Sequence, residues 1–382
     1  MKKVFFLFLS FYIFTYSFSQ TIHDSIYVAG FRASRILSSY PNNQFPSDDY
    51  WAYVGNAMAS KFDSTGPAAV WIVSLYQNAG TTRLNFLNPG GSWPYITFGS
   101  TDQNESCLDR FDQEGFRVWL QVEPGAADVD TLIHLVMNQY KHHPCVKGFG
   151  IDVEWFNAQD YSGGQHVTDS MAQHWEQTLK AFDTDYTLFL KHYSYSWMPP
   201  SFRGDILFVD DSQGFTGLTQ MTTEFEAWGS HFSTNDVAFQ FGYPADSTWW
   251  TLYTDPPQTI GNSLRSNIPN CYGLFWVDFT ICKIFDITVG TENIDTEKFS
   301  FEIFPNPVKE KAILKFELKN ISSISIIVYD IKGNEIAKVM NDTLLAGKHE
   351  IEYNVTVLKA GNYFIGIKTE NGIRKEKITV VH

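Results

Sequence analysis

The sequence has few cysteines, little positive charge and only one long apolar run. Its 382 residues carry 28 Lys and Arg against 42 Asp and Glu, a formal net charge of −14 at pH 7. Because nucleic-acid-binding proteins need a basic surface to neutralise phosphates, this balance argues against nucleic acid as a main partner. The four cysteines include no C-x-x-C pair, so neither a disulfide-built scaffold nor a cysteine zinc site is predicted.

The apolar run is confined to the N-terminus. Lys2 and Lys3 precede an apolar, aromatic segment over residues 4–18, and small or polar residues end it. A short basic region, a brief apolar stretch and a small-residue end are typical of a secretory signal peptide, and a membrane anchor is the alternative. We predict a signal peptide over residues 1–19 and no transmembrane segment in the mature protein.

Tryptophan divides the rest of the chain. All 11 tryptophans lie between Trp51 and Trp276, and the polar stretch 288–298 follows this aromatic part. Such a polar stretch between two regions of different composition is typical of a linker. We therefore predict one domain over residues 20–287, a linker over 288–298 and a second domain over 299–382.

The second domain shows the period-two pattern of β-strands. Apolar and polar residues alternate over 312–318, 323–329 and 363–368, and Gly, Pro and Asn turns separate these segments. Strands at this spacing predict a small β-sandwich. No carboxylate pair and no histidine or cysteine cluster gathers there, so the sequence assigns this domain no chemistry.

Four motifs in this domain resemble the C-terminal sorting domain of the type IX secretion system of Bacteroidetes. They are Phe304-Pro-Asn-Pro-Val308, Val328-Tyr-Asp-Ile-Lys-Gly333, Leu358-Lys-Ala-Gly-Asn-Tyr363 and Lys377-Ile-Thr-Val380. The resemblance implies that the type IX secretion machinery is a partner and that the mature protein is secreted or held at the cell surface. A plain carbohydrate-binding sandwich is the alternative.

The first domain alternates short, almost continuously apolar runs with helical patterns, as parallel strands buried on both faces do. Eight such units match a (β/α)8 TIM barrel in size, and no glycine-rich phosphate turn favours a doubly wound sheet. The predicted fold class is α/β, a (β/α)8 TIM barrel followed by a small all-β sandwich. The predicted strands are Ser25–Phe31, Ala68–Leu75, Phe116–Val122, Gly148–Val153, Thr187–Lys191, Ile206–Val209, Val237–Phe241 and Tyr272–Val277.

In a TIM barrel, functional residues gather where the strands end, on the C-terminal rim. Carboxylates and aromatic rings follow most of the predicted strands. Because indole and phenol faces stack on sugars while carboxylates bond hydroxyls, this combination favours a glycan substrate. The predicted substrate-binding residues are Glu123, Trp155, Tyr193, Asp210, Asp211, Tyr243, Trp276 and Asp278.

The most specific feature is the pair Asp152 and Glu154, separated by one valine. If both lie on one strand, their side chains point to the same side. Two like charges this close raise one of the two pKa values. A protonated Glu beside an ionised Asp is what the acid of a glycosidase requires, so Asp152 and Glu154 are the predicted catalytic residues. In the alternative, Asp152 caps a helix and Glu154 forms a salt bridge.

The segment Gly148-Phe-Gly-Ile-Asp-Val-Glu154 is similar to the fourth-strand motif of family 18 glycoside hydrolases, D-G-x-D-x-D-x-E. Trp276 resembles that family's eighth-strand tryptophan, which lies under the sugar. The resemblance implies substrate-assisted hydrolysis of N-acetylhexosamine glycans. Glu154 would protonate the glycosidic oxygen and Asp152 would orient the 2-acetamido group. This mechanism needs no metal and no cofactor.

The motif is incomplete, because Lys147 and Gly150 replace its first two aspartates. A glycan-binding barrel without catalysis therefore stays open. Glu123 is a rival partner for Glu154, as nucleophile or base in a two-carboxylate mechanism. A metal-dependent hydrolase is a third possibility, in which Lys191, His192 and the pair Asp210 and Asp211 join the predicted acids. For the four cysteines, we expect neighbours to pair after export.

Overall fold

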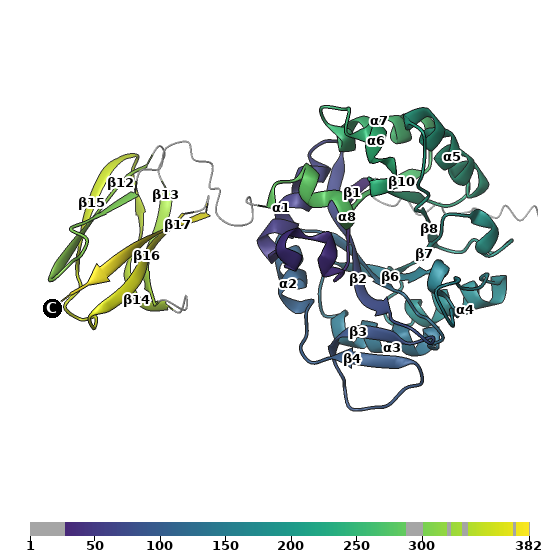
Figure 1. Ribbon diagram of the computed structural model, residues 1–382, viewed down its shortest axis with the longest axis horizontal. Helices are drawn as coiled ribbons and strands as arrows, with labels where there is room; N and C mark the ends of the chain where they lie inside the picture. The colour runs from purple at the N-terminus through teal and green to yellow at the C-terminus, as the bar shows by residue number, and fades with distance from the viewer. Residues whose placement is uncertain (1–26, 288–300, 319–321, 331–334, 370–371, 382) are drawn as a thin grey trace, which may run out of the picture.

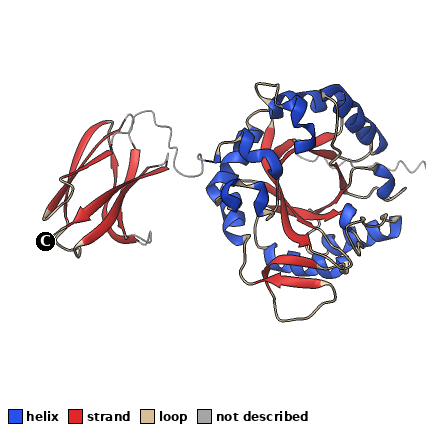
Figure 2. Ribbon diagram, viewed as in Figure 1, coloured by secondary structure: helices blue, strands red, loops and turns tan. Residues whose placement is uncertain are grey.

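The computed structural model describes residues 27–287, 301–318, 322–330, 335–369 and 372–381. The predicted signal peptide, residues 1–19, and the predicted linker, residues 288–298, lie outside the described residues. The described chain forms a closed parallel barrel with flanking helices, followed by antiparallel sheets (Figures 1 and 2). The predicted fold class is therefore confirmed.

Eight parallel strands close the barrel, because the first strand pairs with both the second and the last. All eight overlap the predicted apolar runs. In order around the barrel they are β1 (Tyr27–Ala33), β2 (Thr65–Tyr76), β5 (Arg117–Val122), β6 (Val146–Asp152), β7 (Thr187–Lys191), β8 (Ile206–Asp210), β9 (Val237–Phe241) and β10 (Cys271–Val277).

Helices cover the outside of the barrel (Figure 2). Side-chain capping marks the start of some of them: Thr168 accepts a hydrogen bond from the Met171 backbone N–H, 3.3 Å away, and begins the helix that follows. The α-helices are α1 (Asp48–Ala59), α2 (Glu105–Gln113), α3 (Val129–Tyr140), α4 (Asp169–Lys180), α5 (Leu218–His231), α6 (Ser247–Trp250), α7 (Pro256–Asn267) and α8 (Asp278–Ile284).

Alternation along the strands sorts the apolar residues into two cores. One core fills the barrel interior and includes Val28, Trp119 and Phe275. The other lies between the strands and the helices and includes Phe31 and Trp276. Because the side-chain period of a strand is two, neighbours such as Phe275 and Trp276 must belong to different cores.

One segment extends the sheet beyond the barrel. Strand β3 (Thr82–Leu87) runs antiparallel to β2, and β4 (Ile96–Gly99) pairs with β3. The prediction missed both strands, because they are short and carry polar residues such as Arg83 and Asn85 instead of an apolar run. The extension lies next to the carboxyl end of β2.

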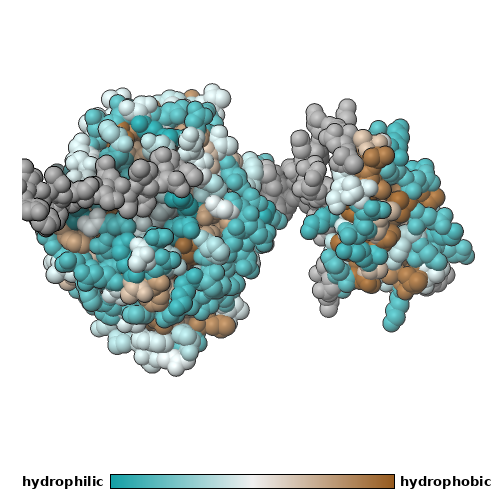
Figure 3. Space-filling model, turned by 180° about the vertical axis from the view of Figure 1, so that it is seen from behind, coloured by the Kyte–Doolittle hydropathy of each residue, from teal (hydrophilic) through white to brown (hydrophobic). Residues whose placement is uncertain are grey.

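The C-terminal unit contains two antiparallel sheets around an apolar core of its own, as predicted. Figure 3 shows apolar side chains at the surface of this unit, while polar side chains dominate the visible face of the barrel. No helix among the described residues is long and apolar enough to cross a membrane. The strands are β11 (Phe301–Phe304), β12 (Lys311–Leu318) and β15 (Gly347–Asn354) in one sheet, and β14 (Glu335–Leu344), β13 (Ser322–Tyr329), β16 (Gly361–Thr369) and β17 (Gly372–Val380) in the other.

The cysteines do not pair. Cys107, Cys145, Cys271 and Cys282 are all free in the structure, so the expectation that neighbours form disulfides is wrong. Cys145 instead donates a hydrogen bond to the backbone carbonyl of Leu108, 3.7 Å away. Three of the four thiols are buried and behave as small apolar side chains.

Candidate active site

A lysine lies between two carboxylates at the carboxyl ends of the middle barrel strands. The Lys191 Nζ is 2.8 Å from Asp152 Oδ2 and 2.5 Å from Asp211 Oδ2. All three side chains are buried. Their mutual attraction raises the pKa of Lys191 well above its ordinary value, against the effect of burial. The mouth of the barrel therefore contains a compensated ion network, where the sequence predicted carboxylates and aromatic rings.

Asp152 and Glu154 do not share a strand. Strand β6 ends at Asp152, and Glu154 lies in the 3₁₀-helix η3 (Val153–Trp155) that follows. The prediction that both residues lie on one strand is therefore wrong, and strand alternation does not set the direction of the Glu154 side chain. Their charges still interact, because the Asp152 carboxylate is one of the groups that raise the pKa of Glu154.

Glu154 is half-buried at the rim, and its pKa is raised to about 7. Burial is the largest cause, since it disfavours the charged carboxylate. The cation of Lys191 lowers the pKa, and the carboxylates of Asp152 and Asp211 raise it. At neutral pH a substantial fraction of Glu154 is protonated, which is the state that a general acid needs.

Glu123 follows β5, the neighbouring strand, and is 7% exposed. Its Oε2 accepts a hydrogen bond from the Tyr76 backbone N–H at 2.8 Å. Burial and the nearby charge of Asp152 raise the pKa of Glu123 to about 7, despite the positive charge of Arg32. The structure thus places a second carboxyl group with a raised pKa on the strand next to the one that leads to Glu154.

Three aromatic rings gather beside these acids. Tyr76 and Trp155 stack with ring centroids 4.9 Å apart and an interplanar angle of 14°. Tyr161 packs edge-on against both rings and is 69% exposed. The sequence identified Trp155, but it missed Tyr76 and Tyr161, because only the fold brings the end of β2 against the loop after β6.

Tyr193 and Tyr243 occupy different environments. Tyr193 is 50% exposed and stacks on the buried ring of His192, with centroids 4.1 Å apart. Tyr243 is buried, and its hydroxyl donates a hydrogen bond to Asp211 Oδ2 at 3.3 Å. Tyr193 is thus accessible to a ligand, whereas Tyr243 supports the ion network around Lys191.

Asp210 and Asp278 are enclosed. One oxygen of Asp210 accepts from the Ser212 backbone N–H at 2.8 Å, and burial raises its pKa well above the ordinary value. Asp278 Oδ1 forms an ion pair with Arg32 at 2.5 Å. Asp278 Oδ2 accepts hydrogen bonds from the Ser34 backbone N–H, the Ser34 hydroxyl and the Tyr40 hydroxyl. The structure therefore places both carboxylates among protein donors and not at the exposed rim.

Trp276 is also enclosed. It is fully buried in the core between strands and helices, where its ring packs edge-on against Phe241 and Trp250. Its Nε1–H donates to Thr280 Oγ1 at 2.8 Å. The structure does not bring Trp276 to the mouth of the barrel, so it cannot act there as the floor that the family 18 resemblance implied.

Metal-ligating groups converge elsewhere in the described chain. Glu105, His142 and His143 bring donor atoms together on the outer surface, and Asp109 and Asp112 also approach His143. At the mouth, the position between Asp152 and Asp211 is occupied by the ammonium group of Lys191. The described residues therefore do not form the metal site predicted as an alternative for this position.

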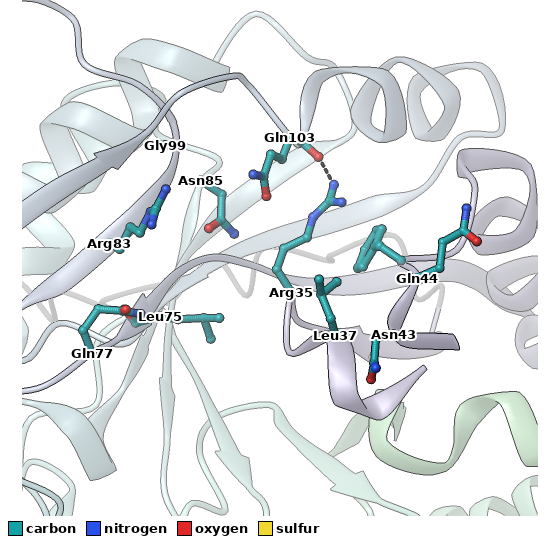
Figure 4. Close-up of a pocket in the computed structure, with 11 residues that line it drawn as sticks. Arg35, Leu37, Asn43, Gln44, Leu75, Gln77, Arg83, Asn85, Gly99 and Gln103 are labelled. Carbon is teal, nitrogen blue, oxygen red and sulfur yellow. Dashed lines mark hydrogen bonds between the residues drawn. The ribbon is translucent and has the colours of Figure 1, made fainter. Parts of the chain in front are cut away.

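A cavity of about 570 Å³ opens beside the end of β2 (Figure 4). The segment after β1, the end of β2 and the β3–β4 extension supply its walls. None of its lining residues is acidic. Among them are Arg35, Phe45, Leu75, Gln77, Arg83 and Gln103.

Comparison with known proteins identifies one end of the chain. Residues 302–381 match the family described as the secretion system C-terminal sorting domain. The sorting domain predicted from the four motifs is thus confirmed, and it indicates type IX secretion to the cell surface or the extracellular space. A search of curated proteins finds no match.

Several solved structures are distantly similar. An FMN-binding β-glucuronidase from Facaelibacterium prausnitzii L2-6 has 11% identity and a TM-score of 0.41, covering 94% of this chain and 57% of its own. An endo-β-1,4-mannanase from Thermotoga petrophila has 8% identity and a TM-score of 0.38, and the match covers 94% of this chain and 99% of the mannanase chain. A Bacteroides uniformis β-glucuronidase has 10% identity and a TM-score of 0.37, and the match covers 92% of this chain and 46% of the glucuronidase chain. The chain thus spans about half the length of these glucuronidases, and such distant neighbours do not define its activity.

Proposed function

We propose that this protein is an exported glycoside hydrolase in which Glu154 protonates the glycosidic oxygen of a bound glycan. The observation that carries the proposal is the pKa of Glu154, raised to about 7 at a half-exposed position on the barrel rim. A carboxyl group of this kind holds a proton near neutral pH and reaches solvent, as a general acid must. The sorting domain supports action outside the cell.

The second carboxyl group in this proposal is Glu123. The substrate-assisted route implied by the family 18 resemblance needs Asp152 in contact with the 2-acetamido group of the sugar. Asp152 is only 1% exposed and is paired with Lys191, which favours a structural role in the ion network over contact with the sugar. Glu123 follows the adjacent strand β5, and its ionised form, which a pKa of about 7 leaves partly populated at neutral pH, would act as base or nucleophile in a two-carboxylate mechanism.

The aromatic cluster of Tyr76, Trp155 and Tyr161 would hold the sugar rings. Stacked, partly exposed aromatic faces bind the C–H surfaces of sugars, and hydroxyl groups bond to carboxylates. Tyr193 adds a further exposed ring on the next strand. These residues would position a glycosidic bond at the rim, where Glu154 lies in the 3₁₀-helix η3.

The test is a reducing-end assay on the full chain over chitin oligomers, peptidoglycan, N-glycans and uronate-containing glycans. Glu154→Gln keeps the shape but cannot donate the proton, so we expect kcat to fall by about 10²- to 10⁴-fold. Glu226→Gln, an exposed change on α5, is the matched control and should retain full activity. Activity of the wild type should fall as the pH rises above about 7, because Glu154 then loses its proton.

A glycan-binding barrel without catalysis is the second candidate. The neutralisation of Asp152 and Asp211 by Lys191 favours it, since two of the carboxylates predicted to act at the mouth are engaged in ion pairs. This candidate predicts glycan binding with no new reducing ends on any substrate. Full turnover by Glu154→Gln would instead exclude Glu154 as the acid while leaving another residue to supply the proton.

A further inference from the structure

The cavity beside the end of β2 is lined by two arginines and by no carboxylate, which is unusual in a chain with a net charge of −14. In Figure 4 the side chains of Asn85 and Gln103 lie between the Arg35 and Arg83 guanidinium groups. The β3–β4 extension, which the barrel does not need for closure, supplies Arg83 and Asn85. The extension thus builds one wall of a polar, basic cavity.

Arg35 is held in place without an ion partner. Its guanidinium lies 3.6 Å from the centroid of the Phe45 ring and donates a hydrogen bond to the backbone carbonyl of Gln103. Within the described parts of the chain no carboxylate lies at ion-pair distance from it, and its buried Nε has no hydrogen-bond partner. Burying a guanidinium group whose N–H donors lack acceptors costs free energy, and a bound anion would offset this cost.

The nearest acid does not fill this role. Asp102 accepts hydrogen bonds from the Tyr140 hydroxyl at 3.0 Å and from the Asn104 backbone N–H at 2.8 Å. Its oxygens are therefore engaged away from the cavity, and Asp102 is not among the lining residues. Arg83 is exposed, and the structure gives its guanidinium no hydrogen bond or ion pair within the described ranges. Both guanidinium groups are available to a ligand.

The cavity and the candidate active site adjoin the same strand end, that of β2. Leu75 and Gln77 line it, and Tyr76 between them stacks on Trp155 and donates to Glu123. Its volume of about 570 Å³ is within the range of small-molecule sites and can hold a sugar unit. A glycan lying on the aromatic cluster would reach the arginines by passing this strand end.

We propose that this cavity binds the anionic group, carboxylate or sulfate, of an acidic sugar residue in the glycan. Arginine matches such oxyanions with two parallel N–H donors, and the neighbouring amides bond sugar hydroxyls. The position of this residue next to the cleaved bond rests on the proposed function, whereas the binding of the acidic sugar does not. The substrate class is therefore an acidic glycan, which the negative net charge of the chain would otherwise repel.

Calorimetric titration of the full chain in the Glu154→Gln background tests the inference without turnover. The probes are a uronate-containing oligosaccharide, its carboxyl-reduced neutral counterpart and a sulfated oligosaccharide. We expect the uronate or the sulfated probe to bind at least about 10-fold more tightly than the neutral one. Whichever of the two binds more tightly identifies the anionic group.

Arg83→Gln removes one of the two charges at an exposed position, so it should fold normally and lose about 10-fold in affinity for the acidic probe alone. Arg117→Gln, at the opposite end of the barrel strands, removes the same charge and should leave affinity unchanged. Equal binding of acidic and neutral probes, or equal effects of the two substitutions, would overturn the inference. Acid-selective binding without hydrolysis by the wild type would contradict only the proposed function.

Discussion

Lys191 and Asp152 are register partners on the neighbouring strands β7 and β6, and their side chains form an ion pair of 2.8 Å inside the barrel mouth. The same ammonium group lies 2.5 Å from Asp211, so one cation compensates two buried carboxylates. It also lowers the pKa of Glu154, against the effect of burial. Lys191 therefore links the stability of the barrel to the protonation of the proposed acid.

Replacing Lys191 by Met should destabilise the barrel strongly. The substitution leaves Asp152 and Asp211 buried without their cation, which costs about 3–5 kcal/mol of unfolding free energy. Thermal unfolding by calorimetry measures the loss. Lys180→Met breaks the surface pair with Asp205 and is the matched control, with an expected cost of about 0–1 kcal/mol. Similar losses for the two variants would contradict the importance of the buried network.

Glu123 should make the stability of the fold depend on pH. Its pKa rises from 4.5 to about 7 on folding, so the folded chain binds more protons than the unfolded chain between these values. Stability from this group is fully present below about pH 4.5 and is lost as the pH rises to about 7. Glu123→Gln removes this contribution to the pH dependence, so the variant should gain stability relative to the wild type over this range.

Urea unfolding at about pH 5 and about pH 8 measures this gain. Glu114→Gln, on the outer surface at the end of α2, is the control and should show the same pH profile as the wild type. A profile for Glu123→Gln that runs parallel to the wild type would show that Glu123 is ionised throughout.

The barrel could be predicted from the sequence because each of its strands is buried on both faces and therefore appears as an apolar run. The β3–β4 extension could not, since residues such as Arg83 and Asn85 interrupt its pattern. The sorting domain was predictable from motifs that lie at turns and strand ends. These successes depend on local patterns, which the sequence contains.

The site was only partly predictable, because it depends on where strands end and on which residues become register partners. Strand β6 ends at Asp152, so the alternation of a strand does not set the direction of Glu154. Trp276 lies one residue from the interior-facing Phe275 and so points outward. The pairing of Lys191 with Asp152 results from strand register, which the sequence does not show.

Substituting Trp276 by Phe should affect stability and leave glycan binding unchanged. The change removes the hydrogen bond to Thr280 Oγ1 and part of a buried ring between Phe241 and Trp250. A loss of about 1–3 kcal/mol in unfolding free energy is expected, measured by urea denaturation. A selective loss of glycan affinity in a stably folded Trp276→Phe protein would contradict this expectation and indicate that Trp276 contributes to glycan binding.

Substituting Trp155 by Ala should have the opposite effect. Trp155 is half-exposed and stacks on Tyr76 at the rim, so its ring is available to a sugar. Loss of this surface should weaken glycan affinity by roughly two- to tenfold, with a small change in stability. Titration with the best glycan from the reducing-end screen, run beside Trp276→Phe, separates the two tryptophans. If Trp155→Ala binds as tightly as the wild type, the aromatic cluster does not hold the sugar, and the glycan must lie on another part of the rim, such as the one around Tyr193.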